Sequence, residues 1–401
     1  MRIWEFDRIG GIASERFDIN QDGALQFVTT ILGFLCMDHE ELGFDPTIMT
    51  LHGERYIEVE RDGQIERIII DQVMKRTCCI AGRATTCWKA HREGDTTPLV
   101  IKDSWQYTDR VEEGEILQQA TTNGVINVAR LCYHETVRIR GADDDIQVNI
   151  RKGLDITKAT NYRSGRSLFP PSTRTTGAQS KSRSRSTGLK RSSSEINADL
   201  PSSSNKRSCP TSRADATDKT PSNRVYRRII LRDFGSPIYK ASSQVALLAA
   251  LQGCIQGHES LLDAGFLHRD ISINNLVINE ANKFSPPAFL LDFWVLFWIC
   301  IHYNGPTERA RVVPIYDKWN YLDTRELARN KTGLVAVERQ FLRDISESFT
   351  PYYQCLAQCV NRLRRLVFPM HSPWEREDRE LYSKMRQALE AAQEELTRQG
   401  V

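Results

Sequence analysis

One short stretch of the chain places acid–base and amide side chains at a fixed spacing. The sequence LHRDISINNLVIN covers residues 267–279, where Asp270 follows a His-Arg pair and Asn275 comes five positions later. Transfer of a phosphoryl group needs a carboxylate that accepts the proton of the attacking hydroxyl, and an amide oxygen that binds a metal ion. We therefore interpret Asp270 as a catalytic base and Asn275 as a catalytic metal ligand.

A second carboxylate for the metal is expected after the hairpin that follows this loop. Residues 276–279 and 288–291 are short β-type runs, and Asp292 stands at the end of the second run. An unrelated surface loop could contain His-Arg-Asp by chance, but chance does not explain the preceding helix, Asn275 and the hairpin together. Asp292 is therefore predicted to bind the metal beside Asn275.

The upstream half of the chain supplies a cation and an acid in the order that phosphate binding requires. Residues 99–102 are predicted to form a strand ending in Lys102, and Glu113 follows eleven residues later on a predicted helix. In protein kinases a strand lysine binds the α- and β-phosphates of ATP and is held by a helix glutamate. Lys102 and Glu113 fit these roles, although each one alone would more often be a surface charge.

The loop that would cover the phosphates is only partly glycine-rich. Gly82 matches the first glycine of the G-x-G-x-x-G pattern, whereas Ala84 and Cys87 replace the other two. Gly82 is the predicted cofactor-binding residue of this loop, and the replacements make close approach of the backbone at Ala84 and Cys87 less easy. An Asp-Phe-Gly tripeptide at 233–235 precedes His-Arg-Asp, so we interpret it as a connector between lobes.

The first part of the chain is predicted to be rich in strands. Residues 1–50 mix helix and loop, with an apolar stretch at 27–37. The alternating pattern of residues 54–70 predicts a β-hairpin whose turn is Asp62-Gly63. A helix is expected at 110–121. Further strands are predicted at 77–80, 87–90, 99–102 and 125–137.

The chain after residue 223 is predicted to be mainly helical. A serine at 242 or 243 can cap a helix that ends near Gly265. The run at 293–301 is apolar on all sides, which predicts a helix buried all round. A capping box that starts at Ser372 is expected to open the last helix. The apolar stripe of that helix is Leu381, Met385, Leu389, Ala392 and Leu396.

Residues 160–223 separate these two parts and differ from both in composition. The segment holds 24 serines and threonines, 12 basic and four acidic residues, so its formal charge is +8; the whole chain carries +3, which leaves −5 for the rest. Too few apolar side chains are present to offset the entropy of ordering, which predicts a disordered insertion. We interpret it as a solvated linker; the alternatives are a nuclear-import signal, a phosphorylation tract or a weak nucleic-acid contact.

Composition and cysteine use exclude several classes of protein. The chain has 401 residues, of which 40% are hydrophobic, and this suffices for a folded body larger than one ordinary domain. No run reaches the roughly 20 apolar residues of a membrane span, and the first 20 residues lack a signal-peptide core. The ten cysteines include no CxxC pair and are interpreted as reduced thiols. We therefore expect an intracellular protein, in the cytoplasm or nucleus, without a membrane partner.

Taken together, the sequence resembles the fungal-type protein kinase family, a divergent branch of the protein-kinase fold. The resemblance runs over nearly the whole chain, and its most specific segments are VIKDSWQ, EEGEILQQA, HRDISINN, FWVLFWICIHYNGP and CVNRLRRLVFP. It implies a bilobal α+β fold, ATP and Mg²⁺ as cofactors, and transfer to Ser or Thr of a protein substrate. It also implies that the nucleotide and catalytic positions are held by Lys102, Glu113, Asp270, Asn275 and Asp292.

The resemblance divides the chain into four parts. These are an N-terminal extension of the kinase-like domain at 1–55, a β-rich small lobe at 56–159, the disordered insertion at 160–223 and a helical large lobe at 224–401. The activation segment, on which a protein substrate docks, is expected to be missing, because Asp292 is followed directly by the apolar helix. We therefore expect little or no phosphoryl transfer by this chain.

Three interpretations of the missing segment and of the function stay open. The chain is a pseudokinase that binds nucleotide or acts as a scaffold, or it is a kinase sequence from which coding residues are omitted. A kinase of small molecules uses the same catalytic loop, and the positions of Lys102, Glu113 and Asn275 do not distinguish it from a protein kinase.

Overall fold

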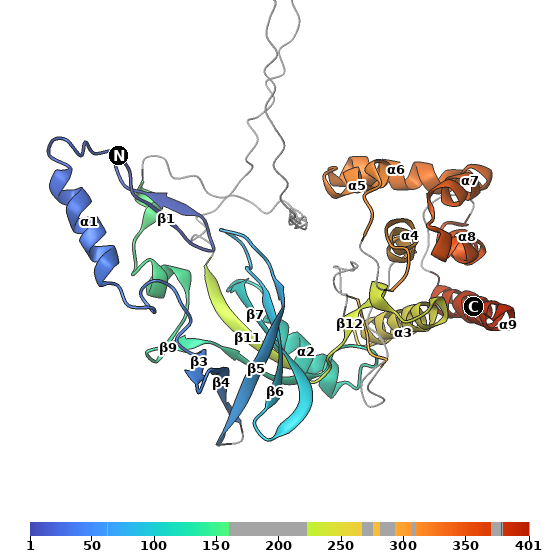
Figure 1. Ribbon diagram of the computed structural model, residues 1–401, viewed down its shortest axis with the longest axis horizontal. Coiled ribbons are helices and arrows are strands. Elements are labelled where there is room, and N and C mark those ends of the chain that lie inside the picture. The colour runs from blue at the N-terminus through green and yellow to red at the C-terminus, as the bar shows by residue number, and fades with distance from the viewer. Residues whose placement is uncertain are drawn as a thin grey trace, which may run out of the picture.

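The computed structural model describes residues 1–61, 63–159, 223–266, 276–280, 293–306, 310–369, 378 and 380–400. Figure 1 shows a β-rich part formed mainly by the first half of the chain, beside a helical part formed by the second half. The predicted α+β order of a β-rich lobe followed by a helical lobe is confirmed. Residues 160–222, the His-Arg-Asp loop and Asp292 lie outside the described residues.

The β-rich lobe is built on a seven-stranded antiparallel sheet in the order β3-β4-β5-β6-β7-β11-β8. The predicted hairpin is the β4–β5 pair, in which Gly63 has a φ of 76°. The strand predicted at 77–80 is wrong, because residues 77–85 turn back between β5 and β6, and the Thr77 amide donates to the Thr85 carbonyl at 2.9 Å. The strands are Met49–Leu51 (β3), Glu54–Arg61 (β4), Gln64–Arg76 (β5), Thr86–Arg92 (β6), Asp95–Tyr107 (β7), Leu131–Thr136 (β8) and Arg224–Leu231 (β11).

Strand β11 re-enters the sheet after the insertion and lies between β7 and β8. It pairs antiparallel with both strands, and Ile229 lies opposite Lys102 of β7. One face of the sheet buries an apolar cluster from five of its strands, β4, β5, β6, β7 and β11. Its members are Ile57, Val59, Ile68, Ile70, Trp88, Ala90, Leu99, Ile101 and Ile230.

The N-terminal residues form a separate hairpin and an exposed helix. Strands β1 (Trp4–Phe6) and β2 (Gly11–Ala13) pair with each other, and helix α1 (Ala24–Cys36) has no buried residue. A buried ion pair fixes the hairpin, because Arg151 Nε donates to Asp7 Oδ2 at 2.5 Å. The remaining small elements of this lobe are Arg138–Ile139 (β9), Ala142–Asp143 (β10), Ile146–Ile150 (η1) and Ile156–Lys158 (η2).

Helix α2 (Glu113–Thr122) confirms the helix predicted at 110–121 and packs against β8. The contact is close because the helix presents a glycine there. A Cβ atom at Gly114 would lie 2.4 Å from Cγ of His134 on β8. The missing side chain therefore lets the first turn of α2 approach the sheet.

The helical lobe follows a short connector from the sheet. Its helix α3 (Gln244–Asp263) begins at the predicted serine cap, since Ser243 Oγ accepts from the Ala246 amide at 3.1 Å. The last helix, α9, begins at Leu381, and the capping box at 372–375 lies outside the described residues. The other helices are α4 (Phe293–His302), α5 (Pro314–Asp317), α6 (Thr324–Ala336), α7 (Glu338–Ser348) and α8 (Ala357–Val367), with 3₁₀ turns at Ile238–Lys240 (η3), Lys318–Asn320 (η5) and Pro351–Leu356 (η6).

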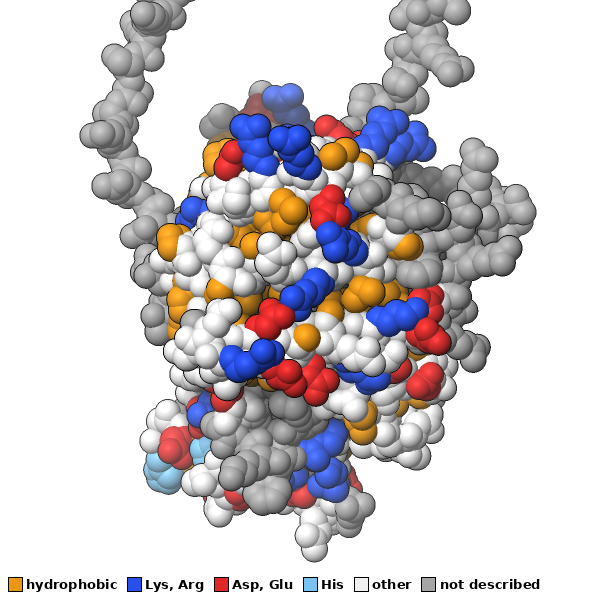
Figure 2. Space-filling model, turned by 90° about the vertical axis from the view of Figure 1, so that its right-hand side faces the viewer, with side chains coloured by type: hydrophobic (Ala, Val, Ile, Leu, Met, Phe, Trp, Pro, Cys, Tyr) orange, Lys and Arg blue, Asp and Glu red, His pale blue; other side chains and the backbone are white. Residues whose placement is uncertain are grey.

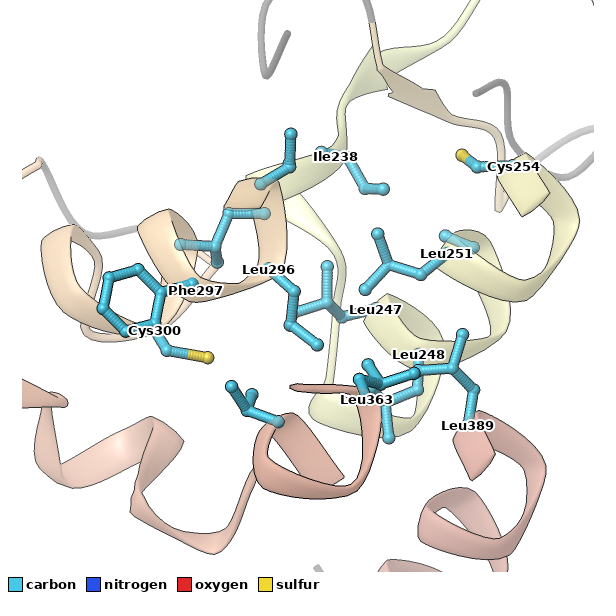
Figure 3. Close-up of a cluster of buried hydrophobic side chains, with 14 of the residues drawn as sticks. Ile238, Leu247, Leu248, Leu251, Cys254, Leu296, Phe297, Cys300, Leu363 and Leu389 are labelled. Atoms are coloured by element: carbon cyan, nitrogen blue, oxygen red, sulfur yellow. The ribbon is translucent and has the colours of Figure 1, made fainter. Parts of the chain in front are cut away.

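The core of the helical lobe gathers around α3 and α4. Figure 3 shows Leu247 and Leu251 of α3 pointing toward Leu296 of α4, with Leu363 and Leu389 from α8 and α9 below them. Over residues 294–302, helix α4 is buried as predicted, except that its two tryptophans, Trp294 and Trp298, are partly exposed. Three small-lobe residues belong to the same cluster, so the two lobes share a continuous core; they are Ala120, Val125 and Val128.

The connector between the lobes contains the Asp-Phe-Gly tripeptide, as predicted. Asp233 is buried and accepts from the Arg130 amide at 2.7 Å and from its guanidinium at 2.6 Å. The next strand, β12 (Ser236–Pro237), pairs antiparallel with β13 (Val277–Ile278). This pairing ties the connector to the residues that directly follow the His-Arg-Asp loop.

Surface and cysteine features agree with the composition. On the outer side of the helical lobe, Figure 2 shows acidic and basic side chains interspersed with apolar ones. Within the described part of the chain, every helix is too short or too polar to cross a membrane. The nine cysteines of that part are free thiols.

Candidate functional site

Lys102 of β7 and Glu113 of α2 meet beside the sheet, as their order in the sequence predicts. Lys102 Nζ donates to Glu113 Oε1. Glu113 is the first residue of α2, and the close packing of Gly114 on His134 holds this end of the helix against β8. The strand and the helix therefore bring a lysine and a glutamate together from positions eleven residues apart.

A third charged residue joins this pair from the loop between β5 and β6. Arg83 Nη2 donates to Glu113 Oε2 at 2.6 Å, so the two carboxylate oxygens have different cationic partners. Arg83 was not among the site residues predicted from the sequence. Its position next to Gly82 could have indicated a role. Two expected glycines are replaced near this position, and a cationic side chain can donate to phosphate the hydrogen bonds that backbone amides would otherwise donate.

The two cations keep Glu113 ionised. Burial raises the pKa of this carboxyl group, but the charges of Lys102 and Arg83, together with their hydrogen bonds, outweigh burial and lower the pKa to about 2. At neutral pH the three side chains therefore carry two positive charges and one negative charge. The cluster has a net charge of +1, which favours an anionic ligand.

The backbone of the β5–β6 loop is fixed on both sides of Arg83. The Gly82 amide donates to the Arg8 carbonyl at 2.9 Å, and the Trp105 amide of β7 donates to the Arg83 carbonyl at 2.8 Å. Gly82 has a φ of 130°, which favours glycine, and Ala84 has a φ of 44°, which is uncommon for a residue with a side chain. The loop therefore keeps a glycine-like bend at Ala84 although that glycine is absent.

Two further side chains, both on β6, lie on the face of the sheet that carries Lys102. Cys87 of β6 lies opposite Lys102 in the antiparallel pairing, and burial raises the pKa of its thiol. Lys89 Nζ lies 5.3 Å from the centre of the Phe234 ring, within the range of a cation–π contact. Phe234 thus links the connector to the same pair of strands that carries Lys102.

The His-Arg-Asp loop itself lies outside the described residues, so the roles of Asp270, Asn275 and Asp292 stay predictions. Its two neighbours are placed. Phe266 closes the C-terminal end of α3, with its amide donating to the Leu261 carbonyl at 2.8 Å, and the buried Leu276 accepts from the Ile238 amide at 3.1 Å. Helix α4 begins at Phe293, so no residue separates Asp292 from this helix.

Metal binding was predicted for Asn275 and Asp292, which are among those undescribed residues. Elsewhere, within the ranges that the structure describes, no three His, Cys, Asp or Glu side chains group closely enough to hold a metal ion.

The comparison with protein families decides the identity of the chain. The sequence model of a family described as fungal protein kinase matches residues 1–295, about three quarters of the chain. This chain belongs to the fungal protein kinase family. The match includes the seven-stranded sheet, α2, α3 and the His-Arg-Asp loop, and it ends just inside α4. No curated protein matches the chain.

Proposed function

We propose that this fungal protein kinase binds ATP with Mg²⁺ beside the face of β7 that carries Lys102. The observation that carries the proposal is the ion pair between Lys102 and Glu113, which joins the strand to α2. In protein kinases this pair must be in place for the lysine to bind the α- and β-phosphates.

The described residues fit an anionic nucleotide at this position. Lys102 and Arg83 supply two cations for one carboxylate, and Gly82 provides the bend over which the phosphates are expected to lie. Bound ATP supplies the transferable phosphoryl group, and Mg²⁺ neutralises charge on its oxygens. Lys102 orients the phosphates, while Glu113 holds Lys102 in place.

For transfer itself, the proposed base is Asp270, which accepts the proton of a Ser or Thr hydroxyl on a protein substrate. Asn275 and Asp292 are the proposed ligands of Mg²⁺. These three roles follow from family membership and from motif position.

A second candidate function is a pseudokinase that binds nucleotide or serves as a scaffold. The observation in its favour is that α4 begins at Phe293, directly after Asp292. A protein kinase uses the segment at this place to dock its substrate, whereas here the residue after the proposed metal ligand Asp292 is already the first residue of α4. We therefore propose nucleotide binding with little or no transfer as the activity of the chain.

Two measurements on the full chain test this proposal. We expect saturating Mg²⁺–ATP to raise the free energy of unfolding of the wild-type chain, by about 2.7 kcal/mol at a hundred times the dissociation constant. Lys102→Met should lower this stabilisation to about half or less at the same concentration of ATP. A shift of the same size in Lys102→Met would contradict nucleotide binding at this site.

The second measurement distinguishes the two candidates. Purified chain is incubated with labelled ATP and a mixture of Ser- and Thr-containing peptides, beside Asp270→Asn. Incorporation indistinguishable from that of Asp270→Asn supports the pseudokinase. Robust incorporation that Asp270→Asn abolishes would show an active kinase.

A further inference from the structure

Glu113 is shared by two cations that come from different elements and differ in exposure. Lys102, on β7, is 26% exposed, whereas Arg83, in the β5–β6 loop, is 51% exposed. A half-exposed ion pair exchanges its partner more readily than a better buried one, because water compensates each charge when the pair opens. Of the two ion pairs of Glu113, the one with Arg83 is therefore the one that opens more readily.

The loop holds Arg83 so that its side chain is the part that can move. Its carbonyl accepts from the Trp105 amide, and the neighbouring Gly82 amide donates to the Arg8 carbonyl. Arg8 also donates from Nη1 to the Cys79 carbonyl at 2.7 Å, which fixes the loop from the N-terminal hairpin. With the backbone tied at these points, the guanidinium can turn while the loop keeps its shape.

The loop and the start of β6 lack two of the glycines that let backbone amides approach phosphate. Ala84 and Cys87 stand at those positions. A guanidinium can replace the missing amides, because its planar N–H groups donate two parallel hydrogen bonds to phosphate oxygens.

We propose that Arg83 is a second phosphate-binding cation, which stays paired with Glu113 until a nucleotide binds. When the phosphates of a nucleoside di- or triphosphate arrive, Arg83 turns from Glu113 Oε2 to the phosphate oxygens, and Lys102 keeps its contact with Oε1. Glu113 then serves both as the support of Lys102 and as the resting partner of Arg83. The inference deepens the proposed function and rests on it.

Titration calorimetry on the full chain tests the role of Arg83 with three probes: Mg²⁺–ATP, Mg²⁺–ADP and adenosine. For Arg83→Met we expect the dissociation constants of ATP and ADP to rise at least about tenfold, as loss of a charge-assisted bidentate contact implies. The constant for adenosine should stay within about twofold, because adenosine has no phosphate to contact. Arg83→Lys should recover part of the affinity for ATP.

The matched control is Arg67→Met on β5. Arg67 pairs with Glu58 at 3.0 Å and is 40% exposed, but the pair joins β4 and β5 and includes neither Lys102 nor Glu113. Arg67→Met should bind all three probes as the wild type does. If Arg83→Met does not fold, as judged by its thermal transition, Arg83→Lys is compared with the wild type instead, and loss confined to ATP and ADP is still expected.

The outcomes separate this inference from the proposed function. If the wild-type chain binds none of the three probes, the proposed function is contradicted, and the proposed role of Arg83 is overturned as well. Wild-type chain that binds ATP while Arg83→Met binds it equally well overturns the role of Arg83 alone. Equal losses for ATP and adenosine in Arg83→Met also overturn it, because they indicate a structural role.

Discussion

Lys102 and Asp103 are consecutive residues of β7 whose side chains serve opposite faces of the sheet. Lys102 contacts Glu113 on one face, and Asp103 accepts from Arg228 of β11 at 3.0 Å on the other. Arg228 also donates to Asp45 at 2.9 Å, ahead of β3. A buried charge cluster thus fixes β7 on the face of the sheet opposite the one that carries the candidate site.

Loss of Arg228 should destabilise the chain strongly. The Arg228 and Asp103 side chains are each 1% exposed, and burial lowers the pKa of Arg228, but the charge of Asp103 outweighs burial and raises it above its ordinary value. Arg228→Met leaves Asp103 buried without its cation, so we expect a loss of about 3 to 5 kcal/mol in the free energy of unfolding. Urea denaturation measures this loss.

The control for Arg228→Met is Arg343→Met on α7. Arg343 pairs with Glu347 at 2.9 Å, and both side chains are well exposed. Its removal should cost less than about 1 kcal/mol. Equal costs for the two substitutions would show that the buried cluster does not stabilise the sheet.

The contact of Gly114 with His134 predicts that even one methyl group disturbs the site. In Gly114→Ala the new Cβ would lie 2.6 Å from Cβ of His134, so α2 or β8 must shift. We expect a loss of about 1 to 3 kcal/mol in the free energy of unfolding, and weaker ATP binding because Glu113 moves with the helix. Denaturant unfolding and calorimetry measure the two effects.

Gly333→Ala in α6 is the matched control, because nothing lies within 4 Å of a Cβ atom at Gly333. A helix-interior glycine in open space gains stability on replacement, so an increase of about 0.5 to 1 kcal/mol is expected. The close packing of α2 would be refuted if Gly114→Ala stabilised the chain as Gly333→Ala does.

The lowered pKa of Glu113 predicts that the chain loses stability in acid. Its pKa of about 2 lies below the ordinary value of 4.5, so it stabilises the native state above pH 4.5, and this contribution is lost as the pH falls toward 2. Glu113→Gln should therefore cost about 1 to 3 kcal/mol at pH 7. The cost should shrink as the pH is lowered from about 5 to 2. A cost independent of pH in urea denaturation would contradict the ion pairs.

The raised pKa of Asp144 predicts the opposite dependence of stability on pH. Burial raises the pKa of its carboxyl group to about 6, although Asn149 Nδ2 donates to it at 2.7 Å. A native-state pKa above the unfolded value of 3.8 means that the ionised group destabilises the fold above pH 6, and that protonation relieves this as the pH falls toward 4.

Asp144→Asn should raise the free energy of unfolding at pH 7 by about 1 to 2 kcal/mol, after allowance for solvent screening. At pH 4 the variant should differ little from the wild type. Urea denaturation at the two pH values measures both. Destabilisation at pH 7 would indicate that the carboxylate has a favourable partner there, which contradicts this account.

Local patterns in the sequence sufficed to predict much of the scaffold. The hairpin turn at Gly63, the serine cap of α3 and the apolar run of α4 each depend on neighbouring residues, and the structure has all three. These features need no knowledge of distant packing. The approach of Lys102 and Glu113 was predicted as well, but from the order of the strand lysine and the helix glutamate in protein kinases. In the structure it also depends on the packing of Gly114 against His134 of β8.

Contacts between distant segments could not be predicted in this way. Arg83 lies 30 residues from Glu113, and Arg228 lies 125 residues from Asp103 across the insertion. Which strands become neighbours decides both contacts, and the sequence pattern does not state the strand order. The strand predicted at 77–80 failed for a related reason, since the loop that carries Gly82 and Arg83 needs those residues for its turn.

The most direct test of the central claim is a calorimetric titration of the full chain with Mg²⁺–ATP, comparing wild type, Lys102→Met and Lys384→Met. Lys384 on α9 also forms an ion pair, with Asp378 at 3.1 Å, but lies in the helical lobe. The account predicts saturable binding to the wild type and to Lys384→Met, and at least about a tenfold loss for Lys102→Met, as removal of a charge-assisted contact implies. Binding by Lys102→Met at wild-type affinity would contradict it.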